Sequence, residues 1–329
     1  MGMKQRAILF TIMFWGIPGT LLACEPIIPL TQLFSGSTLV AGSFQFDQHI
    51  AGSDITLTAA QPLATDPRIS LASGTDMGAG AKLIAVTGGD ITLSERSGDF
   101  RIDRVTSSAG NVSLAATGTN GSIVEVADEP PAYGTTPWVI GNSITLSSRD
   151  GGIGSATDFL EINSSNQAAG AVIALARNGV YLTETAGDLN IDKVLSRISD
   201  VVLIAQQGSI LESGADSQAD VQGQNIDLIA ASPGSRIGDA GKLVEFLCAG
   251  TGHRPNDGFQ IEQYAPGTGR LVAEANAGVY LMETSGAVNV LEILSPAGDV
   301  ELSVHDSVLA GEDLNLLESG GQSFLGKGR

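Results

Sequence analysis

Acidic side chains at repeated positions are the first residues in this 329-residue chain that could do chemistry. The stretch "DFRID" carries Asp99 and Asp103, and the related stretch "DLNID" carries Asp188 and Asp192. Because alternate residues of a strand share a face, each pair of acids points to the side opposite its apolar neighbours. Carboxylates in an outward row are ligands that Ca²⁺ accepts. The sequence therefore makes these four aspartates candidate calcium ligands.

The spacing of these acids argues against catalysis. Positions four apart along a strand lie ~13 Å from each other, which exceeds the ~5–9.5 Å between the working carboxylates of glycosidases. A third related stretch has Ala287 and Leu291 at positions where the first two have acids. We therefore predict no catalytic residue and no cofactor apart from the candidate calcium, with solvated strand faces as the alternative to a metal site.

Three glutamates, Glu95, Glu184 and Glu283, recur in all three copies of the repeated stretch. Each follows a leucine by two positions and precedes a glycine by three, so it stands where a strand becomes a turn. A carboxylate in that place can accept backbone N–H bonds from the turn. The pattern predicts a structural role for these glutamates.

Two insertions break the repeats and supply the candidate binding residues, because loops that leave a regular scaffold commonly carry recognition. The first, "VADEPPAYGTTPW", contains Tyr133 and Trp138, whose rings can stack on sugars. The second, "LCAGTGHRPNDGFQIEQYAPGTG", contains four residues that can form a polar pocket: His253, Arg254, Asp257 and Tyr264. In the alternative interpretation, both loops pack back over the scaffold and Trp138 is buried.

A 25-residue phrase explains why these positions recur. "DITLSERSGDFRIDRVTSSAGNVSL" returns without gaps 89 residues later, beginning at Gly179, and again after a further 99 residues. Short apolar pieces such as "ITL", "VYL" and "IDLIA" alternate with polar residues and are bounded by Gly, Asp, Asn and Ser, which is typical of strands. Repeats of this length indicate a solenoid, a propeller or an array.

Composition favours the solenoid, because aromatic residues make up only 5% of the chain while small aliphatic residues and 42 glycines suit a narrow core and tight turns. We predict an all-β, single-stranded parallel β-helix of about three repeats of ~90 residues, each with three or four coils. Tandem β-sandwich domains are the alternative. The predicted segments are a signal peptide at 1–23, a linker or cap at 24–52, solenoid repeats at 53–318 with copies near 90–178, 179–277 and 278–318, and a polar tail at 319–329.

The N-terminus predicts export. Lys4 and Arg6 precede a 17-residue apolar run from Ala7 to Ala23, which is the pattern of a secretory signal. The run ends in "LLAC", which resembles the lipobox of bacterial lipoproteins and implies lipidation of Cys24; simple secretion is the alternative. The net charge of −19 becomes −21 without residues 1–23, which excludes nucleic acid as a partner. With Cys24 lipidated, Cys248 has no partner, so the fold cannot depend on disulfides.

The repeated phrases and the "GSIVE" and "GSILE" pieces at Gly121 and Gly208 resemble the β-solenoid regions of large bacterial exoproteins, namely filamentous-haemagglutinin-like adhesins and β-strand repeat surface proteins. The resemblance implies a secreted or cell-surface adhesin or structural protein that is not an enzyme. Its expected partners are extracellular polysaccharide or cell-surface components, with membrane contact only through a lipid anchor. A β-helical polysaccharide lyase or hydrolase and a fragment of a longer exoprotein are the alternatives.

Overall fold

The computed structural model describes residues 37–41, 44–46, 50–52, 55–59, 69–71, 75–126, 134–167, 170–214, 218–230, 232–248, 269–284, 288–304, 314–316 and 324–325. Within these residues no helix is long and apolar enough to cross a membrane. The described chain is built from β-strands that alternate between two sheets, here named sheet A and sheet B.

Sheet A contains β1 (Ser37–Ala41), β4 (Ile55–Ala59), β7 (Leu83–Thr87), β9 (Phe100–Ser107), β11 (Ile123–Glu125), β12 (Val139–Ile140), β14 (Leu160–Asn163), β16 (Val180–Glu184), β18 (Val201–Ala205), β21 (Ile226–Ala230), β23 (Arg270–Ala275), β25 (Val288–Leu294), β27 (Leu314–Leu316) and β28 (Phe324–Leu325). Sheet B contains β2 (Phe44–Phe46), β3 (Ile50–Gly52), β5 (Ile69–Leu71), β6 (Thr75–Met77), β8 (Ile91–Glu95), β10 (Val112–Ala116), β13 (Ile144–Ser148), β15 (Ala171–Ala176), β17 (Leu189–Ser196), β19 (Ile210–Glu212), β20 (Val221–Gly223), β22 (Val244–Cys248), β24 (Gly278–Glu283) and β26 (Asp299–Val304).

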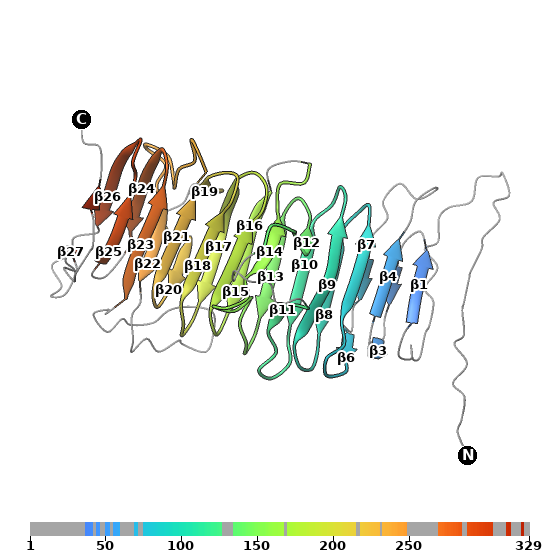
Figure 1. The fold of residues 1–329 in the computed structure, drawn as a ribbon. Helices are drawn as coiled ribbons and strands as arrows, with labels where there is room; N and C mark the ends of the chain where they lie inside the picture. The colour runs from blue at the N-terminus through green and yellow to red at the C-terminus, as the bar shows by residue number, and fades with distance from the viewer. Residues whose placement is uncertain are drawn as a thin grey trace, which may run out of the picture.

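The pairing of these strands is parallel throughout. The chain passes from one sheet to the other and back, so each coil adds one rung to each sheet, and the coils stack into a long body (Figure 1). The predicted all-β parallel β-helix is confirmed. Tandem β-sandwiches are excluded, because those are built from antiparallel sheets.

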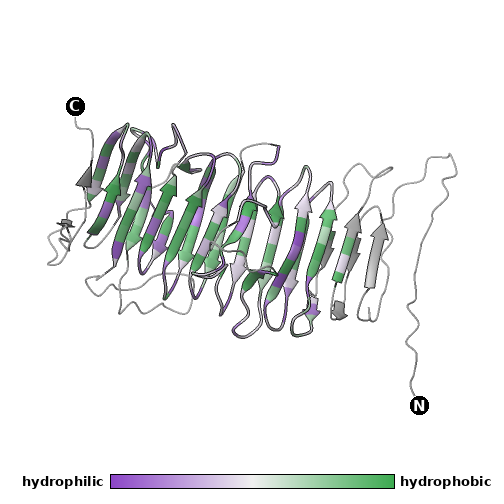
Figure 2. Cartoon of the chain, viewed as in Figure 1, coloured by the Kyte–Doolittle hydropathy of each residue, from purple (hydrophilic) through white to green (hydrophobic). Residues whose placement is uncertain are grey.

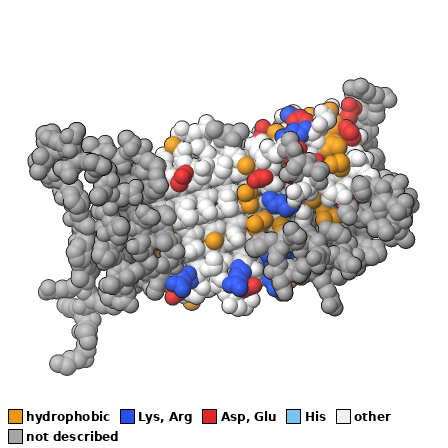
Figure 3. Space-filling view, turned by 180° about the vertical axis from the view of Figure 1, so that it is seen from behind, with side chains coloured by type: hydrophobic (Ala, Val, Ile, Leu, Met, Phe, Trp, Pro, Cys, Tyr) orange, Lys and Arg blue, Asp and Glu red, His pale blue; other side chains and the backbone are white. Residues whose placement is uncertain are grey.

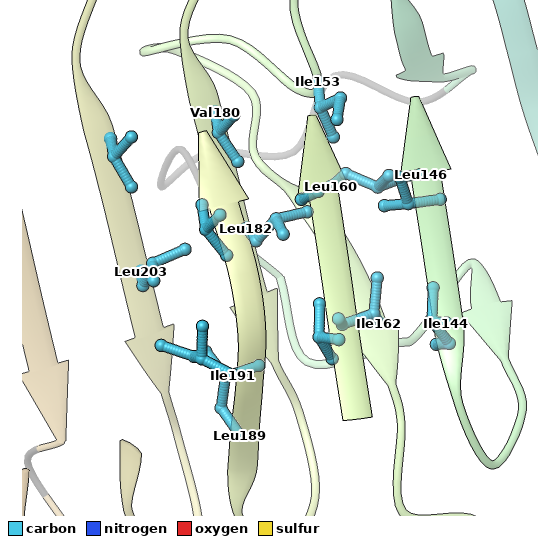
Figure 4. Close-up of a cluster of buried hydrophobic side chains, with 14 of the residues drawn as sticks. Ile144, Leu146, Ile153, Leu160, Ile162, Val180, Leu182, Leu189, Ile191 and Leu203 are labelled. Carbon is cyan, nitrogen blue, oxygen red and sulfur yellow. The ribbon is translucent and has the colours of Figure 1, made fainter. Parts of the chain in front are cut away.

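The core lies between the two sheets and follows from strict alternation along the strands. In β7 and β10, for example, every second residue is buried and the residues between them are half-exposed. Hydrophobic positions recur in this way along both sheets (Figure 2). Aliphatic side chains of successive coils, including Leu146, Leu182 and Ile191, gather in the space between the sheets (Figure 4). Each fully buried Ile, Leu or Val stabilises the fold by roughly 1.5–3 kcal/mol, so the core can hold the coils together.

The inward residues predicted from the repeated phrase are confirmed. Eight of them are at most 1% exposed: Phe100, Ile102, Val112, Leu114, Leu189, Ile191, Val201 and Leu203.

Successive copies of the phrase lie on opposite sheets. Three steps along sheet B lead from β8, where the first copy begins, to β15, and the next strand, β16, begins the second copy in sheet A. The same count leads from β16 to β24 in sheet B, where the third copy begins. Each repeat therefore takes three and a half coils, and equivalent residues of neighbouring copies face opposite sides of the body.

Glycines in the phrase allow the coils to turn and to stack closely. Gly98 and Gly187 have φ angles of +70° and +76°, which favour glycine because a Cβ is strained there. Gly121 and Gly208 stand on the next coil above them. A Cβ on Gly121 would lie 2.3 Å from the carbonyl oxygen of Gly98, and one on Gly208 would lie 2.1 Å from that of Gly187. The "SGD" or "AGD" piece therefore forms the corner of one coil, and the "GSI" piece stacks against that corner from the next coil.

Strands also occur outside the predicted solenoid range of 53–318. β1, β2 and β3 lie in the segment predicted as a linker or cap, and β28 lies in the predicted tail, where it pairs with β25. Both sheets begin in the predicted linker, and sheet A ends in the predicted tail. The predicted signal peptide, with Cys24, lies outside the described residues.

Candidate functional site

Two of the candidate calcium ligands stabilise corners between coils. Asp99 Oδ1 accepts a hydrogen bond from the Ser122 N–H at 2.9 Å, and Asp188 Oδ1 accepts the equivalent bond from the Ser209 N–H at 2.8 Å. In both cases the carboxylate reaches the backbone of the next coil. These bonds give Asp99 and Asp188 a structural role in which one oxygen is already occupied.

The other two, Asp103 and Asp192, lie at irregularities of the sheets. The register of β7 with β9 passes from Ile102 to Arg104 and leaves Asp103 unpaired, while that of β15 with β17 passes from Ile191 to Lys193 and leaves Asp192 unpaired. Asp103 forms an ion pair with Lys82 at 2.6 Å, and Asp192 is exposed. Among the described residues, no group of three or more candidate metal ligands includes any of the four predicted aspartates.

The first insertion returns to the body through Trp138. This side chain is half-buried and packs against the hydrophobic core, and its Nε1 is buried without a hydrogen-bond partner in the described part of the chain. Gly134 donates its N–H to Glu161, and Gln206 donates its side-chain N–H to the Gly134 carbonyl oxygen. The described end of the insertion therefore contacts residues of sheet A and of the turn after β18.

The remaining predicted binding residues cannot be placed. Tyr133, His253, Arg254, Asp257 and Tyr264 lie outside the described residues.

The repeated glutamates point inward at the ends of their strands and are fully buried. Glu95 accepts backbone N–H bonds from Met77, Arg96 and Ser97 and a hydroxyl bond from Thr75. The predicted structural role of the repeated glutamates is therefore confirmed for Glu95.

Glu184 fills the same place in the second copy and is held in the same way. It accepts N–H bonds from Ser164 and Ala186 and the Ser164 hydroxyl bond at 2.6 Å. Its structural role is confirmed too. Burial raises the pKa of Glu184 to about 8, although the hydrogen bonds from Ser164 and Ala186 act in the opposite direction.

The third repeated glutamate differs from the first two. Among the described residues Glu283 lacks the hydroxyl and turn N–H donors that hold Glu95 and Glu184. Burial raises its pKa well above the ordinary value, although a hydrogen bond from the Cys248 backbone acts in the opposite direction. Residues 285–287 of the adjoining turn lie outside the described residues.

Each of the first two copies contains an interrupted rung, in which two short strands share one long partner. In sheet A, β11 pairs with the first part of β9 and β12 with its last part. In sheet B, β19 and β20 pair with β17 in the same way. Side chains at the facing ends of the two short strands, and outward side chains of the next rung, lie around the interruption. We name these interruptions the sheet A gap and the sheet B gap.

The sheet B gap brings three carboxylates together. Glu212 ends β19, Asp220 precedes β20, and Glu245 lies in β22 on the next rung; one oxygen of each lies within 4.8 Å of the others. The three side chains, here named the carboxylate cluster, are only 5–6% exposed. Among the described residues, no other group of His, Cys, Asp and Glu meets this geometry.

Hydrogen bonds hold the edges of the cluster. Asp220 Oδ2 accepts the Glu245 N–H at 3.1 Å. Lys242 Nζ donates to the Glu212 carbonyl oxygen at 2.7 Å, and Lys193 Nζ donates to the Ala219 carbonyl oxygen. Burial, followed by the neighbouring Glu245, raises the pKa of Asp220 far above its ordinary value. The cluster can therefore hold protons or a cation, because three buried carboxylates repel one another when all are charged.

The sheet A gap has the equivalent backbone hydrogen bond but a different side chain between its two glutamates. The Trp138 N–H donates to the Glu161 carbonyl oxygen at 3.0 Å, as the Asp220 N–H donates to that of Glu245 at 2.8 Å. Trp138 thus occupies the place of Asp220, with Glu125 and Glu161 in the places of Glu212 and Glu245.

Sequence reasoning missed the carboxylate cluster, although part of its signal was present. In "GSILE" the alternation that buries Ile210 also turns Glu212 inward, as the burial pattern of β19 shows. The alignment of "FLEI" with "LVEF" pairs Glu161 with Glu245. No sequence pattern, however, indicated that Asp220 and Glu245 meet, because this depends on which coil each residue occupies.

Comparisons with other proteins add no relative. No protein-family model matches this chain, and the searches of curated proteins and of solved structures give no match either.

Proposed function

We propose that the chain is a non-catalytic β-solenoid exposed outside the cell, an adhesin or extracellular structural module of the filamentous-haemagglutinin-like kind. Its partner in this proposal is extracellular polysaccharide or another cell-surface component. The N-terminal apolar run directs export, and a lipid on Cys24 provides the membrane anchor.

The observation that carries the proposal is a ladder of small hydroxyl side chains on the outer face of sheet B. Thr92, Ser113 and Thr145 stand in register on β8, β10 and β13. Beside them, Ser94, Ala115 and Ser147 form a second row in register. All six side chains are exposed or half-exposed and none is charged.

Such a ladder suits a repeating polymer. Hydroxyls both donate and accept hydrogen bonds, so they match sugar hydroxyls. Their spacing along the body is that of parallel strands, ~4.8 Å, so several weak contacts can form along one polysaccharide chain and add in avidity. On the back of the molecule the region nearer the N-terminus is mostly white, while charged and apolar side chains gather toward the C-terminal half (Figure 3).

The burial of the acids supports a non-catalytic role. The carboxylate cluster is 5–6% exposed and the repeated glutamates are 0% exposed. A polysaccharide lyase or hydrolase needs acid and base groups that reach the substrate within hydrogen-bond distance. These carboxylates are enclosed by the protein itself.

Binding to polysaccharide-coated surfaces tests the proposal. Ser113→Arg and Thr145→Arg place long charged side chains on the ladder, and Val86→Arg places the same side chain on the outer face of sheet A as a matched control. We expect adhesion to fall by about tenfold for the ladder variants and to stay near wild type for Val86→Arg, because lost contacts multiply in a multivalent interaction. Equal adhesion by all three variants, with unchanged melting temperatures, would refute the role of the ladder.

A further inference from the structure

We propose that the carboxylate cluster of the sheet B gap is a binding site for one Ca²⁺ ion per chain, a property independent of the proposed adhesion. The site would join Glu212, Asp220 and Glu245, which come from two neighbouring rungs of the sheet.

The first argument is geometric. Ca²⁺ binds oxygen ligands at 2.3–2.6 Å, so two ligand oxygens on one ion lie at most about 5 Å apart. The three carboxylate oxygens, each within 4.8 Å of the others, satisfy this limit. Hard oxygen ligands without nitrogen or sulfur are the donor set that Ca²⁺ prefers.

The second argument is independent of the clustering. Glu245 is 6% exposed, and its Oε2 is buried without a hydrogen-bond partner in the described part of the chain. The side chain is directed into the cluster, since one of its oxygens lies within 4.8 Å of an oxygen on Glu212 and on Asp220. A buried polar atom without a partner costs about 1–3 kcal/mol, and a cation bound there would offset this cost.

Two lysines lie beside the cluster. Lys242 and Lys193 donate to the carbonyl oxygens of Glu212 and Ala219. These bonds hold the backbone at the end of β19 and just before β20, beside Glu212 and Asp220.

The sheet A gap supplies the contrast within the same molecule. It keeps two glutamates at the equivalent places but has Trp138 where the cluster has Asp220. With an indole in that position the cluster loses its central carboxylate, so we assign the calcium site to the second copy only.

Isothermal titration of the chelator-treated protein with CaCl₂ tests this site, with MgCl₂ and NaCl of equal ionic strength as controls. For wild type we expect a saturable signal with one Ca²⁺ per chain. Asp220→Asn and Glu245→Gln keep the shape of the side chains and should each weaken binding by about tenfold or more, because each removes one charged ligand. The matched control Glu161→Gln, at the equivalent place in the sheet A gap, should bind Ca²⁺ like wild type.

Several results would overturn the proposal. Absence of saturable binding to wild type would mean that the cluster holds only protons. Binding that survives both cluster variants within about twofold would place the ion elsewhere, as would equal loss in Glu161→Gln. Circular dichroism of each variant separates loss of the site from loss of the fold, and absence of saturable binding to wild type overturns the proposal whether or not the variants fold.

Discussion

The sheet A gap and the sheet B gap share an equivalent backbone hydrogen bond but have different side chains between their two glutamates. In the first, Trp138 packs against the hydrophobic core, and the described end of its loop covers Glu161. In the second, Asp220 occupies the same backbone position and meets two glutamates. The comparison shows that the same backbone geometry can hold an indole packed against the core in one gap and a carboxylate beside two glutamates in the other.

The largest effect should come from the core that both copies share. Ile102→Asp and Ile191→Asp each place a charge at an equivalent, fully buried position. We expect each to lower the free energy of unfolding by at least about 4 kcal/mol, because a buried charge has no partner there. Chemical denaturation measures the loss, with Asn190→Asp on the outer face as the control. An unshifted transition for either isoleucine variant would break the equivalence of the two copies.

The next largest effect concerns the repeated glutamates and pH. Burial raises the pKa of Glu184 to about 8 from an ordinary 4.5, so its neutral form stabilises the fold. That contribution is complete below about pH 4.5 and is lost as the pH rises through 8, because the folded state then has to bury a charge.

Melting temperatures between pH 5 and pH 9 check this expectation. The wild type should lose stability toward pH 9, and Glu184→Gln should flatten the curve because glutamine resembles the neutral carboxyl group. Glu95→Gln should flatten it less, because four donors support the charged form of Glu95. A Glu184→Gln variant with the same pH dependence as wild type would contradict the assignment.

The smallest effect distinguishes the two gaps directly. Trp138→Ala removes a half-buried ring and should cost roughly 2–3 kcal/mol, less than the 3–5 kcal/mol typical of large side chains in a core. In calcium-free buffer Asp220→Ala should cost no more than about 1 kcal/mol, since the lost hydrogen bond is offset by relief of crowding between carboxylates. Urea denaturation compares them; a larger loss for Asp220→Ala would mean that its carboxylate is a structural requirement.

Much of the fold was predictable from the sequence because its signals are local. The alternation around Ile102 and Ile191 sets which residues point inward, and the glycines at Gly98 and Gly187 mark the corners. The place of Glu95 and Glu184 at the strand ends predicts that they accept backbone N–H bonds. The alternation, the corners and the bonds from Arg96, Ser97 and Ala186 depend on residues within a few positions of one another, where strand geometry and turn geometry act directly. The bonds that Met77 and Ser164 donate to these glutamates come from the neighbouring coil and were not predictable in this way.

Other features were decided only by the tertiary structure. The sequence does not say that a repeat takes three and a half coils, because that count depends on how much chain each corner and insertion consumes. It therefore does not reveal that neighbouring copies face opposite sides, or that Asp99 and Asp188 reach the next coil. Glu212 and Glu245 are 33 residues apart in the sequence, and they meet at Asp220 because stacking places their coils on adjacent rungs of sheet B.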